Sequence, residues 1–231
     1  MKGCYLCIEM ITPYLFDQNL LLALNFDGGS AMDQVMYVVS GKLTWVPFYL
    51  CILWLVYTRL GLRKLVLFAL TVALLIACAD QTATLAKEYL PKSRPTHFAP
   101  IMADVHTVNG YVGGPYGTVS SHAANCFGLA LLSSLLIRRR WFAWMMFGWA
   151  ALVSYSRIYL GVHYPMDILF GTLEGLFWAF VWYRALCWAD MRITALRRRD
   201  RHTPYRLCFM RRWREKRMLW PLVSFLPGNR A

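Results

Sequence analysis

Charged residues are scarce in this chain, and acidic residues are scarcer than basic ones. Asp and Glu number 12 among 231 residues, Lys and Arg number 25, and hydrophobic residues make up 58% of the chain. Charged residues amount to 16%, whereas a soluble globular domain uses roughly 25% to cover its surface. The composition therefore excludes an ordinary soluble domain, and the length suits one compact membrane domain with a tail.

The cysteines lack the pattern of a disulfide framework. They number seven, an odd count, and four of them lie within apolar runs: Cys51, Cys78, Cys126 and Cys187. Cysteines in such surroundings are typically small buried hydrophobic residues. The N-terminus has no compact apolar stretch followed by a cleavage site, so we expect no removable signal peptide.

Five apolar stretches are long enough, or nearly long enough, to cross a bilayer, which takes roughly 20 apolar residues. They cover residues 32–58, 64–86, 123–137, 141–158 and 165–188, and the first has a polar notch at residues 40–42. The residues before Leu24 mix apolar and acidic positions, which favours an amphipathic helix at the membrane interface. The sequence thus predicts an all-α membrane protein, a bundle of five transmembrane helices with an N-terminal interfacial amphipathic helix.

The net charge of +13 could indicate a nucleic-acid-binding protein, but the distribution of the charge argues otherwise. Twelve of the 25 basic residues fall between Arg192 and Arg230, and two short basic clusters, at residues 59–64 and 138–140, separate apolar stretches. If five spans alternate, these regions face one side, which the positive-inside tendency makes cytoplasmic. The connections at residues 87–119 and 159–164 then face outward.

We therefore divide the chain into three parts. Residues 1–30 form an interfacial segment, residues 31–188 a transmembrane domain, and residues 189–231 a basic cytoplasmic tail. The tail alternates basic and apolar residues, as at residues 206–213, so we expect it to bind anionic lipid. No motif supports nucleic-acid binding by this tail.

Three short polar blocks lie at the ends of apolar stretches, in the connections that we expect to face outward. They read Lys87-x6-Arg94-Pro95, Ser120-Ser121-His122, and Ser156-Arg157-x5-His163-x3-Asp167. Arginine binds phosphate through two hydrogen bonds and lysine binds it as a point charge. A helix that begins after Ser120 would present free N–H groups to an anion. Asp167, four residues beyond His163, can fix one imidazole nitrogen and leave the other as a nucleophile.

Each block has a structural explanation as well. Lys87 and Arg94 could be interfacial anchors, the second block a helix cap, and the third an ion pair at the interface. His163 and Asp167 could instead bind a metal ion, but three nearby cations would repel it and no further ligands cluster in the sequence. We therefore expect no metal site.

The order and spacing of the blocks resemble the signature of the type-2 phosphatidic acid phosphatase superfamily, K-x6-R-P, P-S-G-H and S-R-x5-H-x3-D. The first and third blocks match fully, and the second has Val119 and Ser121 in place of the family's Pro and Gly. The resemblance covers residues from about 10 to 188. Within the family, the compact form is similar to the bacterial undecaprenyl-diphosphatase and lipid A phosphatase branches.

The resemblance implies a role for each residue of the blocks. His163 would attack phosphorus and form a phosphohistidine, with Asp167 orienting it. His122 would protonate the leaving oxygen and then activate water. Phosphate binding would fall to Lys87, Arg94, Ser120, Ser121 and Arg157. The resemblance implies no metal and no organic cofactor.

The function implied is hydrolysis of a lipid phosphate at the periplasmic face of a bacterial inner membrane. Undecaprenyl diphosphate and a lipid A phosphate are the leading candidate substrates. A glycerolipid phosphatase (for phosphatidylglycerol phosphate or phosphatidic acid), a lipid phosphotransferase and a non-catalytic lipid-binding protein remain as alternatives. Four other polar residues have open roles: Asp80, which could support Lys87 from the same helical face, and Glu174, His97 and His106.

Overall fold

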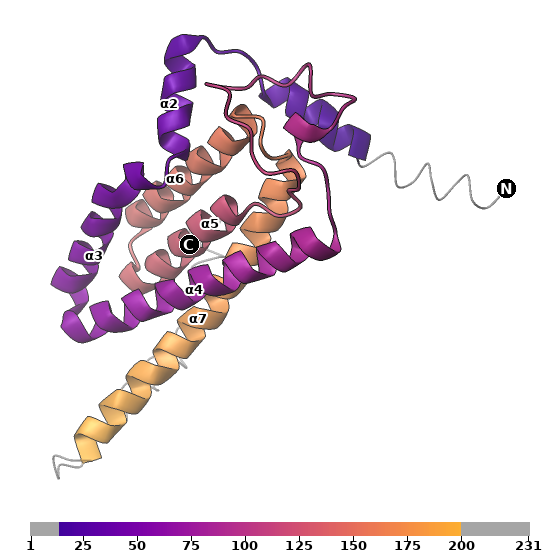
Figure 1. Cartoon of the computed structure of the whole chain (residues 1–231). Coiled ribbons are helices and arrows are strands. Elements are labelled where there is room, and N and C mark those ends of the chain that lie inside the picture. The colour runs from indigo at the N-terminus through magenta and orange to yellow at the C-terminus, as the bar shows by residue number, and fades with distance from the viewer. Residues whose placement is uncertain (1–13, 200–231) are drawn as a thin grey trace, which may run out of the picture. The chain divides into compact units, whose positions relative to one another are not determined.

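The computed structural model describes residues 14–199, and these residues are helical apart from turns, loops and one isolated bridge between Ser93 and Tyr116 (Figure 1). The chain divides into two compact units, Met1–Leu186 and Cys187–Ala231. The packing between the helices lies within the first unit. The expected all-α class is confirmed for the described residues.

The helices follow the apolar stretches closely. A helix over residues 14–24 is followed by α2 (Ser30–Ser40), the short 3-10 helix η1 (Leu43–Trp45), α3 (Val46–Leu60), α4 (Leu62–Tyr89), the 3-10 helix η2 (Pro95–His97), α5 (Ser121–Ile137), α6 (Arg140–Tyr159) and α7 (Pro165–Arg199). Two stretches, Leu43–Leu60 and Leu62–Tyr89, are long and apolar enough to cross a membrane, and Ser121–Ile137 is a shorter apolar helix.

The first apolar stretch differs from the prediction, because residues 32–58 do not form one continuous helix. The helix breaks at Gly41, whose backbone is extended, with φ −71° and ψ 129°. The last carbonyl groups of α2 then accept hydrogen bonds from side chains, Val38 from Thr44 Oγ1 at 2.7 Å and Val39 from Trp45 Nε1 at 2.8 Å. The polar notch in the sequence is therefore a break between α2 and η1.

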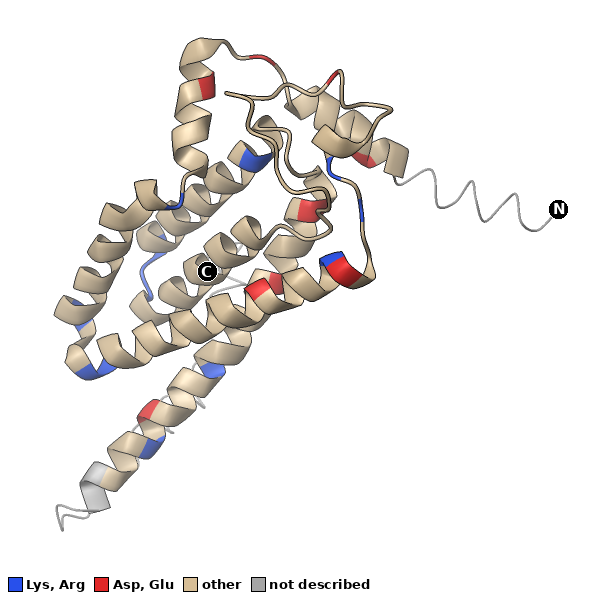
Figure 2. Cartoon of the chain, viewed as in Figure 1, with Lys and Arg blue, Asp and Glu red and all other residues tan. Residues whose placement is uncertain are grey.

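Helices α5 and α6 pack closely against each other, α4 packs against α5 and α3, and α2 packs against α6. The C-terminal end of α4 meets the N-terminal end of α5, where Lys87 Nζ lies 3.3 Å from Ser121 Oγ. The long segment between α4 and α5 folds over this end (Figure 1). The basic connections between α3 and α4 and between α5 and α6 lie at the other end of these helices (Figure 2).

Helix α7 approaches α5 closely because two glycines of α7 face the α5 backbone. A methyl group at Gly171 would overlap the Ser120 carbonyl, and one at Gly175 would overlap the Ala124 carbonyl. Small residues allow helix backbones to approach in this way. The approach brings the Ser120 N–H to 3.0 Å from the Asp167 carbonyl oxygen, so it joins the second polar block to the third.

The close approach predicts that Gly175→Ala destabilises the protein. The added methyl group overlaps the Ala124 backbone, and overpacking of this kind costs about 1–3 kcal/mol. Gly148→Ala on α6 is the matched control, because a Cβ there meets nothing within 4 Å and alanine favours a helix over glycine. Thermal unfolding of the purified variants in detergent checks this. A midpoint for Gly175→Ala at or above that of the wild type would contradict the close approach.

Candidate active site

A cavity of about 970 Å³ lies where the three polar blocks meet. Two residues of each block line it: Lys87 and Arg94 of the first, Ser121 and His122 of the second, and Arg157 and His163 of the third. The break at residues 40–42 and the loop at residues 111–114 also line the cavity. Much of the remaining wall is apolar and comes from α3, α4 and α5, with Ile52, Val72 and Leu129 among its residues. The structure thus brings the blocks together in one cavity that combines cationic and apolar walls.

His163 and Asp167 form a buried pair at the start of α7. His163 Nδ1 lies 3.3 Å from Asp167 Oδ2, and the same oxygen accepts a hydrogen bond from the Tyr164 N–H at 3.0 Å. A carboxylate acceptor places the proton of a neutral imidazole on Nδ1 and leaves Nε2 with a free lone pair. Asp167 is not among the cavity-lining residues, whereas His163 is. The pair therefore has the arrangement of a nucleophile with an orienting carboxylate behind it.

The surroundings of His163 favour its neutral form. Only 2% of the residue is exposed, and burial lowers the pKa of the imidazole well below its usual range. The positive charges of Arg94 and Arg157 lower the pKa further, because they oppose protonation. An imidazole held neutral in this way keeps its lone pair available at neutral pH.

The second block forms the N-terminus of α5. Ser120 is the N-cap, as predicted, and its side chain accepts a hydrogen bond from the Ala123 N–H at 3.4 Å. Ser120 is fully buried and is not among the cavity-lining residues, whereas Ser121 and His122 in the first turn of α5 line the cavity. The free N–H groups of this turn favour an anion at the same place. Among the described residues, no side chain forms a hydrogen bond with the His122 ring, so the ring is free to act on a ligand.

The departure from the family pattern at Ser121 adds a contact within the site. Lys87, in the last turn of α4, lies with its ammonium group 3.3 Å from the Ser121 hydroxyl. The family's glycine could not supply this hydroxyl. In this chain, therefore, Ser121 links the lysine of the first block to the helix N-terminus of the second.

Arg94 is held in place by the loop that follows it in sequence. Its backbone is extended, with φ −66° and ψ 158°, as expected of a residue that precedes a proline. The Nε group donates to the Tyr116 carbonyl at 2.9 Å, and a Cβ at Gly113 or Gly117 would overlap the Arg94 side chain. Burial and the nearby Arg157 charge both lower the pKa of this guanidinium. The two glycines thus let the loop pack directly on the arginine.

Arg157 occupies the last turn of α6 and is only 4% exposed. Its Nη1 group donates to the Ser40 hydroxyl, and its Nη2 group donates to the Tyr111 hydroxyl at 3.1 Å. The buried Nε group has no hydrogen-bond partner within the described part of the chain. The polar notch in the first apolar stretch therefore provides a partner for the arginine of the third block.

The three cations of the blocks share one electrostatic property. Lys87, Arg94 and Arg157 donate hydrogen bonds to hydroxyl and carbonyl groups, and across residues 14–196 none of them forms an ion pair with a carboxylate. Within the described residues, therefore, no direct ion pair neutralises their positive charge. A group of partly or fully buried like charges is stabilised by an anion, and arginine and lysine are the residues that bind phosphate.

Two functional candidates escaped the sequence analysis, Lys92 and Asp17. Lys92 Nζ lies 2.9 Å from Asp167 Oδ1 and 2.7 Å from Asp17 Oδ2. Both contacts span 75 positions of the sequence, and no local spacing pattern signals them. The only hint in the sequence is that an acidic residue lies in the N-terminal amphipathic stretch.

The carboxylates within α4 and α7 form contacts between helices. Asp80 Oδ1 accepts a hydrogen bond from Asn125 Nδ2 at 3.0 Å, and Glu174 accepts one from the Thr82 hydroxyl. Asp80 lines the cavity and Glu174 does not. The Asp80 carboxylate thus contacts α5 by hydrogen bonding, and among the described residues it forms no ion pair with Lys87, the residue it was expected to support.

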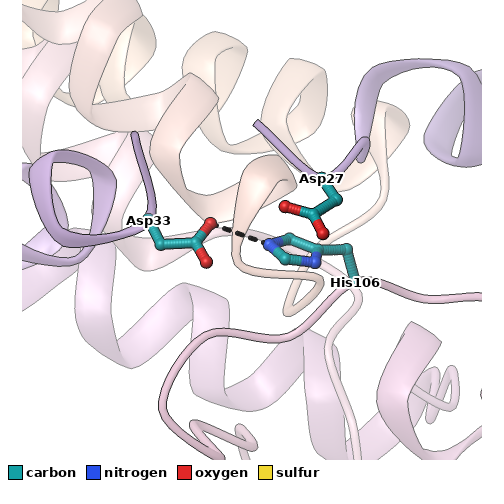
Figure 3. Close-up of side chains that lie close together, drawn as sticks. All are labelled: Asp27, Asp33 and His106. Carbon is teal, nitrogen blue, oxygen red and sulfur yellow. Dashed lines mark hydrogen bonds and ion pairs between the residues drawn. The ribbon is translucent and has the colours of Figure 1, made fainter. Parts of the chain in front are cut away.

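The two loop histidines lie outside the cavity lining. His97 is exposed, and His106 Nε2 lies 2.9 Å from Asp33 Oδ1, with Asp27 beside the pair (Figure 3). The oxygen and nitrogen atoms of these three residues lie within 4.8 Å of one another. Asp33 also accepts a hydrogen bond from the Tyr159 hydroxyl at 2.6 Å, and this bond and the one from His106 lower its pKa. The group therefore ties α2 to the loop and to the end of α6.

Comparison with known proteins agrees with these observations. Residues 64–190 match the PAP2 superfamily. The lipid A 4'-phosphatase of Bacteroides thetaiotaomicron is 36% identical over 72% of this chain and 75% of that protein. The lipid A 4'-phosphatase of Porphyromonas gingivalis is 33% identical over 76% of this chain and 75% of that protein.

Solved structures include a similar fold. The first transmembrane PAP2-type phosphatidylglycerolphosphate phosphatase from Bacillus subtilis superposes with a TM-score of 0.59, at 18% identity, over 79% of this chain and 88% of that chain. The family that the three polar blocks predict is thus confirmed. The chain belongs to the PAP2 superfamily and is a phosphatase.

Proposed function

We propose that this phosphatase is an integral membrane protein that removes a phosphate group from lipid A at the periplasmic face of a bacterial inner membrane. Two kinds of observation support this substrate class. The cavity joins a cationic wall to an apolar wall, as an amphipathic ligand requires. Relatives that share about a third of their residues with this chain are lipid A 4'-phosphatases.

The observation that carries the proposal is the group of cations with neutral partners. Lys87, Arg94 and Arg157 line one cavity with His122 and His163, and their own hydrogen bonds go to uncharged groups. Such a group binds the equatorial oxygens of a phosphoryl group and stabilises the charge that builds up in transfer. The Ser121 hydroxyl and the N–H groups of the first turn of α5 add hydrogen bonds, while Ser120 holds that turn in place.

The reaction proceeds in two steps at His163. The Nε2 lone pair attacks phosphorus, the phosphorus–oxygen ester bond breaks, and the leaving oxygen takes a proton from His122. His122 then takes a proton from water, the water oxygen attacks the phosphohistidine, and inorganic phosphate leaves. Asp167 holds the Nδ1 proton of His163 throughout. This cycle requires His163 neutral, and it requires His122 protonated once a phosphate group is bound and its negative charge offsets the nearby cations, so the rate falls at both ends of the pH range.

Five membrane spans suit the helices of the structure. We assign them to residues 43–60, 62–89, 121–137, 140–159 and 165–188, within η1 and the helices α3 to α7. The basic connections between α3 and α4 and between α5 and α6 then lie on the cytoplasmic side, and the cavity opens on the periplasmic side. The assignment replaces the first expected span, residues 32–58, by the shorter stretch that follows the break.

The membrane contacts at the two ends of the chain complete the proposal. The helix over residues 14–24 exposes Leu15 and Phe16, by 50% and 62%, and buries Asp17, so its apolar face can lie in the lipid interface. The basic tail was predicted over residues 189–231. Residues 189–199 continue α7, and residues 200–231 lie outside the described residues. We propose anionic lipid as the partner of this tail.

We predict that His163→Ala lowers phosphate release by at least about 10³-fold, because the nucleophile is lost. His97→Ala is the matched control, since His97 is exposed and does not line the cavity. Free phosphate is measured from a lipid A substrate with protein purified in detergent, and acid-labile phosphohistidine is trapped in parallel. Turnover by His163→Ala similar to that of the wild type would exclude His163 as the nucleophile.

The same assay decides the substrate among lipid A, undecaprenyl diphosphate, phosphatidylglycerol phosphate and phosphatidic acid. We expect the highest kcat/KM for lipid A, with loss of its 4'-phosphate in the product. A higher value for any other lipid would overturn the lipid A proposal and name the alternative. Loss of lipid phosphate without release of free phosphate would indicate a phosphotransferase instead.

The lowered pKa of His163 predicts unusual chemical reactivity in acid. Diethylpyrocarbonate modifies neutral imidazole. For free N-acetylhistidine, with a pKa of about 6.5, the neutral fraction falls about tenfold between pH 7.5 and 5.5. Burial and the nearby cations hold the pKa of His163 well below that of a free imidazole, so its neutral fraction falls less than that of N-acetylhistidine. The ratio of the His163 rate to the N-acetylhistidine rate, followed by peptide mass spectrometry, should therefore rise as the pH is lowered. A constant ratio would contradict a neutral, buried His163.

A further inference from the structure

We propose that Lys92 is a positioning residue of the active site, which holds Asp167 behind the attacking His163, and that Asp17 of the N-terminal helix holds Lys92 in turn. The inference rests on the proposed function, because it takes Asp167 to orient His163. It adds two residues that lie outside the three polar blocks. It also assigns the helix over residues 14–24 a part in catalysis.

The contacts of Lys92 form a bridge between two buried carboxylates. The ammonium nitrogen lies 2.7 Å from Asp17 Oδ2 and 2.9 Å from Asp167 Oδ1. The side chains of Asp17 and Asp167 are 3% and 1% exposed, and that of Lys92 is 20% exposed. Hydrogen bonds between charged groups at these distances are stronger than those between neutral groups, and they help to fix the orientation of both partners.

Several groups fix the position of the bridge. The Lys92 ammonium lies 4.1 Å from the centroid of the Tyr164 ring, within the range of a cation–π interaction. Asp17 Oδ1 accepts a hydrogen bond from the Met166 N–H at 3.0 Å, one residue before Asp167. The N-terminal helix thus contacts the first turn of α7 both directly and through Lys92.

Lys92 does not have the position of a phosphate ligand. Lys87, Arg94 and Arg157 line the cavity with uncharged partners, whereas Lys92 is not among the lining residues and faces two carboxylates. Its charge is therefore compensated before any substrate binds. This separates its role from that of the three cations of the polar blocks.

The bridge completes the hydrogen bonding of the Asp167 carboxylate. Oδ2 accepts from His163 Nδ1 and the Tyr164 N–H, and Oδ1 accepts from Lys92. With both oxygens held, the carboxylate cannot rotate away from the imidazole, and its negative charge is balanced. Without Lys92, Asp167 Oδ1 would be a buried acceptor without a donor. Removing a partner that supports a catalytic group in this way typically lowers activity.

The test uses Lys92→Met, Asp17→Asn and the double variant Lys92→Met/Asp17→Asn, each assayed for kcat, KM and thermal midpoint in detergent. We expect Lys92→Met to lower kcat about 10-fold to 100-fold, with KM unchanged within about twofold because the cavity wall is intact. Lys92→Arg keeps a cation between the carboxylates and should recover most of kcat. Lys64→Met is the matched control. Lys64 lies in the first turn of α4, at the end of this helix that is far from Lys92, so this variant should leave kcat unchanged.

The double variant separates positioning from folding stability. Lys92→Met leaves two buried carboxylates without a cation, which lowers the thermal midpoint. Adding Asp17→Asn removes one of those charges and should raise the midpoint again, while kcat stays low because Asp167 still lacks its donor. Recovery of kcat together with the midpoint would overturn the positioning role, as would wild-type kcat in Lys92→Met. An active His163→Ala would refute the proposed function instead, so the two failures are distinguishable.

Discussion

The structure of the site depends on keeping the carboxylates beside His163 from pairing with the cations that line the cavity. The cations that face the cavity, Lys87, Arg94 and Arg157, have hydroxyl and carbonyl partners. The carboxylates on the far side of His163 from the cavity, Asp17 and Asp167, share a different cation, Lys92. If Asp167 were paired with one of the cavity cations, it would both neutralise the phosphate site and release His163. The additional lysine allows one small volume to hold a strong anion site and an oriented imidazole together.

This separation requires close contact between helices that are distant in sequence. Gly171 and Gly175 let α7 approach α5 until the Ser120 N–H reaches the Asp167 carbonyl oxygen. The first turn of α5, which presents N–H groups and His122 to the cavity, is therefore fixed relative to the first turn of α7. The glycines contribute to catalysis only through this geometry, and side chains at those positions would move one polar block away from another.

The sequence was informative where function imposes fixed spacing. The spacings from Lys87 to Arg94 and from His163 to Asp167 predicted the family, and the Ser120 cap followed from a local rule. The extended backbone of Arg94 obeys another local rule, since it precedes Pro95. The residues that hold these groups in place were not predictable in the same way. Ser40 meets Arg157 across 117 positions and Lys92 meets Asp17 across 75. Such pairs have no periodicity, and their partners are defined only once the chain has folded.

The break at Gly41 shows that a hydropathy pattern can locate an irregular segment without revealing what the segment does. The notch at residues 40–42 was visible as an interruption of an apolar stretch, yet hydropathy alone favours a continuous span. In the structure, the break turns Ser40 and Lys42 toward the cavity, and Ser40 supplies a neutral partner for Arg157. A continuous helix would have left this buried guanidinium with one hydrogen bond fewer.

The family match covers residues 64–190, but the site draws on residues before that range. Asp17 holds Lys92, Ser40 holds Arg157, and the Asn25 side chain donates to the Tyr159 carbonyl at 2.7 Å and to the Ile158 carbonyl at 3.0 Å. Each of these contacts supports a residue of the shared machinery or its immediate neighbour. The residues that we assign to catalysis therefore lie within the segment that matches the family. Part of the hydrogen bonding that holds them in place comes from the N-terminal region of the chain. Asp17 and Ser40 thus contact residues of the matched segment from outside it.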